Sequence, residues 1–136
     1  MVGIVLVAHC NLAEEFLQVL KLIGGEVDNF YPVRFNPEDS PEDSLRKIAA
    51  AVKKSDRGKG VIILTDMFGG TPSNLSLTLL EEGKVEVVTG VNLPMLIKLT
   101  QSREKNIRLF DLAQEIKSCG QKNISVASDI LKKQTV

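Results

Sequence analysis

The sequence is poor in the residues that build metal sites and disulfide frameworks. Its 136 residues include 1 His, 2 Cys, 1 Tyr and no Trp. A structural zinc site needs about four Cys or His ligands, whereas this chain offers only the adjacent pair His9 and Cys10 and the remote Cys119. Two distant cysteines with no signal peptide ahead of them do not resemble the framework of a small secreted protein. We therefore expect reduced thiols, no metal site and no disulfide.

The chain also lacks an excess of charge of either sign. Its 17 Lys and Arg residues balance 17 Asp and Glu residues, so it has no surplus of basic side chains to neutralise nucleic-acid phosphates. The apolar run at the start, residues 2–8, has no basic flank and is too short to span a bilayer. The expectation is a cytoplasmic protein that neither binds nucleic acid nor inserts into a membrane.

What the chain does contain is typical of one globular domain. Hydrophobic residues make up 43% of the sequence and charged residues 25%, which is an ordinary balance for a folded protein. A length of 136 residues suits a single hydrophobic core. We predict one domain over residues 1–136.

Short apolar runs rich in β-branched residues predict strands that are largely buried. Three such runs cover residues 2–8, 60–65 and 85–89. A weaker candidate over residues 30–35 contains Pro32, which lacks a ladder donor and so favours the edge of a sheet. Near the C-terminus, Ile124 and Val126 alternate with polar residues and predict a short, half-buried strand.

Helical spacing of apolar residues fills the intervals between these runs. The first helix should end at Gly24-Gly25, and the last should end before Gly120. Helix starts are expected at Ser40-Pro41 and Thr71-Pro72, with the hydroxyl residue as cap in each, and at Pro94. Alternation of strands and helices predicts a three-layer α/β/α fold, with helices on both faces of a mainly parallel sheet of four strands.

Polar residues at the ends of two predicted strands are the strongest functional signal. Open parallel sheets bind ligands beyond the carboxyl ends of their strands, where His9 follows the run 2–8 and Asp66 follows the run 60–65. If those strands are neighbours, a carboxylate can fix the tautomer of the imidazole and leave its other nitrogen as a nucleophile. Backbone N–H groups at the following helix start would stabilise an anion such as a phosphoryl group.

A second loop, Gly69-Gly70-Thr71-Pro72, adds backbone that an anion can approach closely and a threonine hydroxyl. Simpler interpretations of these residues remain open. Asp66 can merely cap the loop after its strand, and Gly69-Gly70 can be a plain turn. Burial as an inert thiol is the commoner state for a cysteine such as Cys10.

Three segments of the sequence resemble one family. Residues 4–9 (IVLVAH), 64–74 (LTDMFGGTPSN) and 89–96 (TGVNLPML) closely resemble the IIA component of mannose-family sugar phosphotransferase systems, in the right order and at suitable separations. The resemblance implies a phosphotransferase without cofactor. His9 would accept a phosphoryl group from the carrier protein HPr and pass it to a IIB component, which phosphorylates the incoming sugar.

The resemblance also implies roles for the neighbouring residues. Asp66 would orient His9, and Thr71 would lie near the phosphoryl group. Gly69, Gly70, Cys10 and Asn11 complete the predicted phosphoryl-binding set. Family members are homodimers in which a C-terminal strand crosses to the partner's sheet and runs antiparallel there, and residues 124–126 are the candidate.

Docking of HPr and IIB is expected to use apolar surface near the site, with Met67 and Phe68 as candidates, although a place in the core is an equally good interpretation. The membrane components IIC and IID would be met only indirectly. Alternatives are a regulatory module of the same fold, the phosphodonor subunit of a dihydroxyacetone kinase, and a thiol enzyme using Cys10. The loop and the segment 89–96 favour the sugar-transport branch over the kinase subunit.

Overall fold

A parallel sheet of four strands forms the centre of the molecule. The computed structural model describes residues 1–134. The strands are β1 (Gly3–His9), β2 (Phe30–Phe35), β3 (Val61–Thr65) and β4 (Val85–Thr89), in the order β2-β1-β3-β4. All three strand pairs are parallel. The four strands, the parallel sheet and the edge position of the proline-containing strand are as the sequence predicts.

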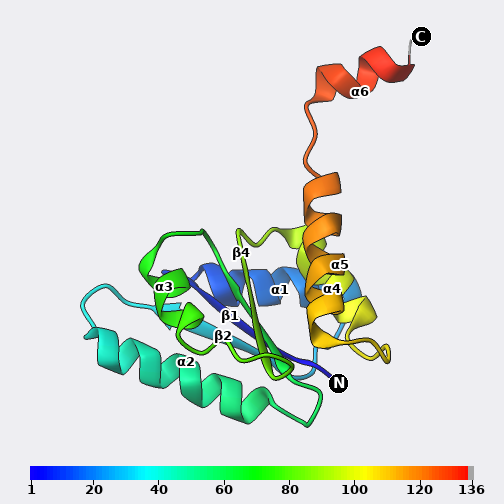
Figure 1. The fold of residues 1–136 in the computed structure, drawn as a ribbon. Coiled ribbons are helices and arrows are strands. Elements are labelled where there is room, and N and C mark those ends of the chain that lie inside the picture. Colours follow the sequence, from blue (N-terminus) through cyan, green and yellow to red (C-terminus); the bar gives the residue numbers. More distant parts are fainter. Residues whose placement is uncertain (135–136) are drawn as a thin grey trace.

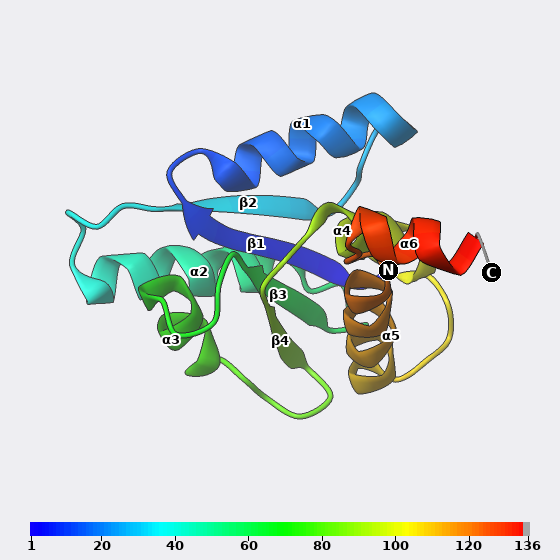
Figure 2. The same ribbon diagram turned by 90° about the horizontal axis from the view of Figure 1, so that it is seen from above.

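Helices cover both faces of this sheet (Figures 1 and 2). The covering helices are α1 (Leu12–Gly24), α2 (Pro41–Ser55), α3 (Thr71–Leu77), α4 (Leu93–Ser102) and α5 (Leu109–Lys122), and α6 (Ala127–Gln134) follows them without covering the sheet. One cluster of buried residues joins the sheet to α1, α4 and α5, and a second cluster joins it to α2 and α3. The predicted α/β/α layering is confirmed.

Local sequence explains most of the helix ends. The Ser40 hydroxyl accepts a hydrogen bond from the Asp43 N–H at 3.1 Å, as expected of an N-cap ahead of a proline at the first helical position. The first helix ends at Gly24, as predicted. Helix α5 instead runs two residues past Gly120, to Lys122, and Gly120 is needed inside it because α4 packs closely there.

The C-terminal region differs from the prediction. Residues 124–126 form an unpaired link, with Ile124 73% and Val126 64% exposed, and α6 follows it. Figure 1 shows the link and α6 standing clear of the sheet. The predicted half-buried strand is therefore wrong for the single chain. Ile124 lines one pocket with β4 residues, but the described sheet consists of β2, β1, β3 and β4 without the link. Exchange of this segment between subunits stays a prediction.

Candidate functional site

The site lies where β1 and β3 end side by side. These strands are hydrogen-bonded neighbours, with Val7 opposite Thr65. His9 is the last residue of β1, and Asp66 directly follows β3. The shared parallel direction therefore brings to one sheet edge two residues that are 57 positions apart in the chain.

A short hydrogen bond joins the two side chains. Nδ1 of His9 lies 2.7 Å from Oδ2 of Asp66, and the backbone N–H of His9 donates to the same oxygen at 3.0 Å. The other carboxylate oxygen, Oδ1, accepts from the Met67 N–H at 3.1 Å. An ionised carboxylate is an acceptor only, so it selects the imidazole tautomer with the proton on Nδ1.

The Asp66 carboxylate is built to stay ionised. Burial by itself raises the pKa of this carboxyl group, but the hydrogen bonds from the His9 backbone and side chain outweigh it and lower the pKa below its ordinary value. Its side chain is 13% exposed, whereas that of His9 is 40% exposed. The aspartate thus supports the ring from inside while the ring itself reaches solvent.

The second nitrogen of His9 is the reactive position in this arrangement. Among residues 1–134, no hydrogen bond involves Nε2. With the proton held on Nδ1, Nε2 carries an accessible lone pair and is a neutral nucleophile. Such a nitrogen can accept an electrophilic group such as a phosphoryl group delivered from solvent or from another protein.

The glycine loop after β3 lies beside the same ring. Gly69 has a φ of +83°, which favours glycine, and a Cβ added at Gly70 would lie 3.8 Å from Cε1 of His9. The N-cap of α3 is Gly70, with no side-chain capping bond. The expectation that Thr71 caps this helix is therefore wrong. Thr71 is exposed at the first helical position, because the chain turns one residue earlier than the proline suggests.

The residues after His9 complete the rim. Cys10 is exposed and has a φ of 53°, so its expected burial as an inert thiol is wrong. Asn11 is the N-cap of α1 and makes no side-chain capping bond. Met67 and Phe68 are 54% and 74% exposed, which excludes a place in the core for either.

Similarity to known proteins shows the family of this chain. Residues 3–117 match the family model EIIA-man, described as the fructose IIA component of the phosphotransferase system. The chain belongs to the EIIA-man family. It is an EIIA component of a sugar phosphotransferase system, a class of phosphotransfer proteins.

Individual EIIA relatives cover different shares of this chain. The sorbose-specific EIIA component of Lacticaseibacillus casei is 37% identical over 97 residues, which are 71% of this EIIA chain and 70% of the relative. The mannose-specific EIIAB component of Escherichia coli K12 is 34% identical over 104 residues, which are 76% of this chain but 32% of the relative. The EIIA crystal structure from Streptococcus agalactiae superimposes with a TM-score of 0.85 at 30% identity, covering 95% of this chain and 99% of that one.

Two further residues of this EIIA component became visible only in the structure. Phe35 ends β2 and packs against the His9 ring, with ring centroids 5.3 Å apart; only the β1–β2 register could have revealed it from the sequence. Asn92, which follows β4, caps α4 through the Met95 N–H and donates to the Gly120 carbonyl. Asn92 therefore holds α4 against α5.

Over residues 1–134, no group of three or more His, Cys, Asp or Glu side chains is arranged to hold a metal ion. In the same part of the chain, no helix has both the length and the apolar character needed to cross a bilayer.

Proposed function

We propose that His9 of this EIIA component is phosphorylated by phospho-HPr and passes the phosphoryl group to a IIB component for sugar uptake. The observation that carries the proposal is the 2.7 Å contact between His9 Nδ1 and Asp66 Oδ2, beside an Nε2 with no partner among residues 1–134. That arrangement leaves one ring nitrogen accessible and fixes its protonation state.

The proposed phosphoryl transfer between the two histidines needs no cofactor. The Nε2 lone pair forms an N–P bond while the P–N bond to the donor histidine breaks, and the electron pair returns to the donor imidazole. His9 gains positive charge as the new bond forms. The Asp66 carboxylate, already bound to Nδ1–H, stabilises that charge, and transfer to IIB reverses the same bond changes.

The loops beside His9 are the proposed phosphoryl-binding groups. Gly69 and Gly70 precede α3, Thr71 is its first residue, and Cys10 and Asn11 precede α1. Backbone N–H groups at helix starts favour negative charge. The proximity of Gly70 to Cε1 of His9 supports a location for the phosphoryl oxygens at this loop.

Partner docking is proposed to use Met67 and Phe68. Both side chains are more than half exposed on the loop that starts beside His9, and exposed apolar side chains next to a reactive group suit a protein that docks two partners in turn. The homodimer, the indirect link to IIC and IID, the cytoplasmic location and the assignment of residues 1–136 to one domain stay predictions.

Phosphorylation of the purified protein tests the proposal. Incubation with phosphoenolpyruvate, the general system enzyme and HPr should give an acid-labile adduct of one phosphoryl group per chain. The chain contains 1 His, so His9→Ala should abolish the adduct and Cys10→Ala should retain it. An adduct that persists in His9→Ala would overturn the proposal, and one lost only in Cys10→Ala would favour the thiol enzyme.

A second arm separates the remaining alternatives. Phospho-His9 should transfer its phosphoryl group to a IIB protein that is encoded with a sugar transporter. Transfer only to a dihydroxyacetone kinase would indicate that the chain is the phosphodonor subunit of that kinase. Transfer to neither protein would favour a regulatory module.

A further inference from the structure

Phe35 is a buried aromatic residue that neither hydrophobic core accounts for. It is 8% exposed, yet it belongs to neither of the two core clusters found among the described residues. Among residues 1–134, its ring contacts one other ring, that of His9, with centroids 5.3 Å apart and the planes inclined at 77°. This is ordinary edge-to-face geometry, which is favoured over a parallel sandwich.

The sheet register explains why this contact exists. His9 and Phe35 are paired positions at the carboxyl ends of β1 and β2. Because β1 lies between β2 and β3, His9 meets Asp66 from the β3 side and Phe35 from the β2 side. The imidazole is thus held from both neighbouring strands, with Gly70 near its Cε1.

One hydrogen bond at Nδ1 does not by itself fix where Nε2 points. The imidazole ring can still rotate about the contact between Nδ1 and Asp66. The His9 side chain is 40% exposed, and the solvent on its open side does not restrict this rotation. A rigid aromatic neighbour removes that freedom. Phosphoryl transfer needs an in-line approach, so the direction of the Nε2 lone pair governs its rate.

We propose that Phe35 is a positioning residue that holds the His9 ring in the orientation from which Nε2 accepts the phosphoryl group. The rate effect rests on the proposed function of His9. The effect on ring orientation does not, because it is a property of the unphosphorylated protein.

The chain offers a matched control for this residue. Phe30 stands at the opposite end of the same strand and is also 8% exposed, but it packs in the larger core cluster and is remote from His9 in the β1–β2 register. Phe35→Leu and Phe30→Leu therefore remove the same ring from the same strand, and only the first removes it from the site.

The test compares these variants by nuclear magnetic resonance and by phosphorylation rate. The chain contains a single His, so every imidazole signal in the spectrum belongs to His9. The wild type and Phe30→Leu should show one tautomer, protonated at Nδ1, and a nuclear Overhauser contact from His9 Hε1 to Gly70. Phe35→Leu should weaken that contact and slow phosphorylation by on the order of tenfold.

Several outcomes would overturn the inference. One is a contact from His9 Hε1 to Gly70 and a phosphorylation rate that stay unchanged in Phe35→Leu. Another is a loss of contact and rate in Phe30→Leu that equals the loss in Phe35→Leu. If Phe35→Leu does not fold, Phe35→Met fills more of the same volume without a ring and is judged by the same signals. Failure of the wild type to be phosphorylated would instead count against the proposed function, while the ring signals would still decide the orienting role of Phe35.

Discussion

At the residue scale, Asp66 serves both the fold and the chemistry of the site. Its carboxylate accepts from the His9 backbone N–H, the His9 ring and the Met67 N–H. The first of these bonds ties the end of β1 to the loop after β3, and the last lies within that loop. The middle one sets the tautomer of the ring.

Replacing the carboxylate by an amide tests the second role. In Asp66→Asn one amide oxygen has to replace two carboxylate oxygens. When it accepts from the Met67 N–H, the NH₂ group faces His9, cannot accept from Nδ1–H, and so favours the other tautomer. We expect phosphorylation of His9 to slow by on the order of 10²- to 10⁴-fold, with little change in circular dichroism. A wild-type rate in Asp66→Asn would show that the tautomer is set by another group.

The same substitution gives a pH-dependent stability difference. The pKa of Asp66 in the folded protein lies below its ordinary value of 3.8, so its ionised form stabilises the fold above that pH. This contribution is lost as the pH falls through the lowered pKa. Urea unfolding should show wild type more stable than Asp66→Asn at pH 6, with the gap closing below about pH 3.8. A gap that widens in acid would contradict the assignment.

At the scale of elements, α4 and α5 approach so closely that one position tolerates only glycine. A Cβ at Gly120 would lie 2.4 Å from Cγ and 2.7 Å from Sδ of Met95. Composition and spacing made Gly120 look like a helix end. Packing between helices instead places it inside α5, where the sequence pattern along one helix cannot reveal it.

Gly120→Ala should therefore destabilise the protein. We expect a loss of about 1–3 kcal/mol from overpacking, measured by urea unfolding. The control is Gly24→Ala, at the last residue of α1, where an added Cβ meets nothing within 4 Å. It should be neutral or stabilising by up to about 1 kcal/mol. Equal effects of the two substitutions would refute the close-packing explanation, and Met95→Ala should relieve the loss in Gly120→Ala.

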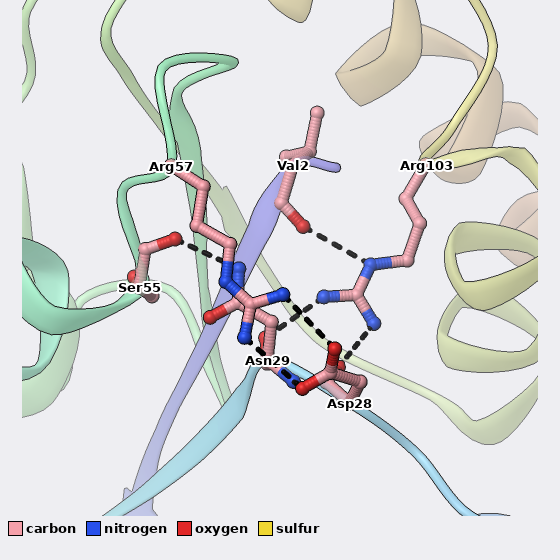
Figure 3. A network of polar contacts seen from close by, with 6 residues as sticks. All are labelled: Val2, Asp28, Asn29, Ser55, Arg57 and Arg103. Carbon is pink, nitrogen blue, oxygen red and sulfur yellow. Dashed lines mark hydrogen bonds and ion pairs between the residues drawn. The ribbon is translucent and has the colours of Figure 1, made fainter.

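At the scale of the whole molecule, a buried arginine joins three segments that are far apart in the sequence. Arg103, 4% exposed, donates to the carbonyls of Val2, Asp28 and Asn29 at 3.0, 2.6 and 2.8 Å (Figure 3). It thus ties the end of α4 to the start of β1 and the entry to β2, where the sheet is farthest from His9. Figure 3 also shows Arg57 paired with the Asp28 carboxylate beside this junction.

Loss of this arginine should weaken the fold without touching the site. Arg103→Met removes the arginine donors from the carbonyls of Val2, Asp28 and Asn29, of which the Asn29 carbonyl still accepts from the Ile4 N–H. We expect a cost of about 3 kcal/mol in the free energy of unfolding. Arg108→Met removes an exposed arginine paired with Asp111 and should cost less than about 1 kcal/mol. His9 phosphorylation should be unchanged in both folded variants. Equal stability losses would show that burial of Arg103 carries no special weight.

Local patterns along the sequence predict much of this architecture. Apolar runs of strand length, helical spacing and the Ser40 cap give the four strands and the first five helices. Parallel alternation then brings His9 and Asp66 to one sheet edge. These features depend on residues close in sequence and on the handedness of strand–helix–strand connections.

Only the tertiary structure decided which residues meet across elements. The register of β1 with β2 places Phe35 against His9, the approach of α4 to α5 requires Gly120, and the turn after β3 makes Gly70 the cap in place of Thr71. The alternation at Ile124 and Val126 predicted a strand, but a strand also needs a partner edge, and within the described single chain these residues pair with none. Each of these outcomes depends on distances between segments remote in sequence, which no periodicity along one segment contains.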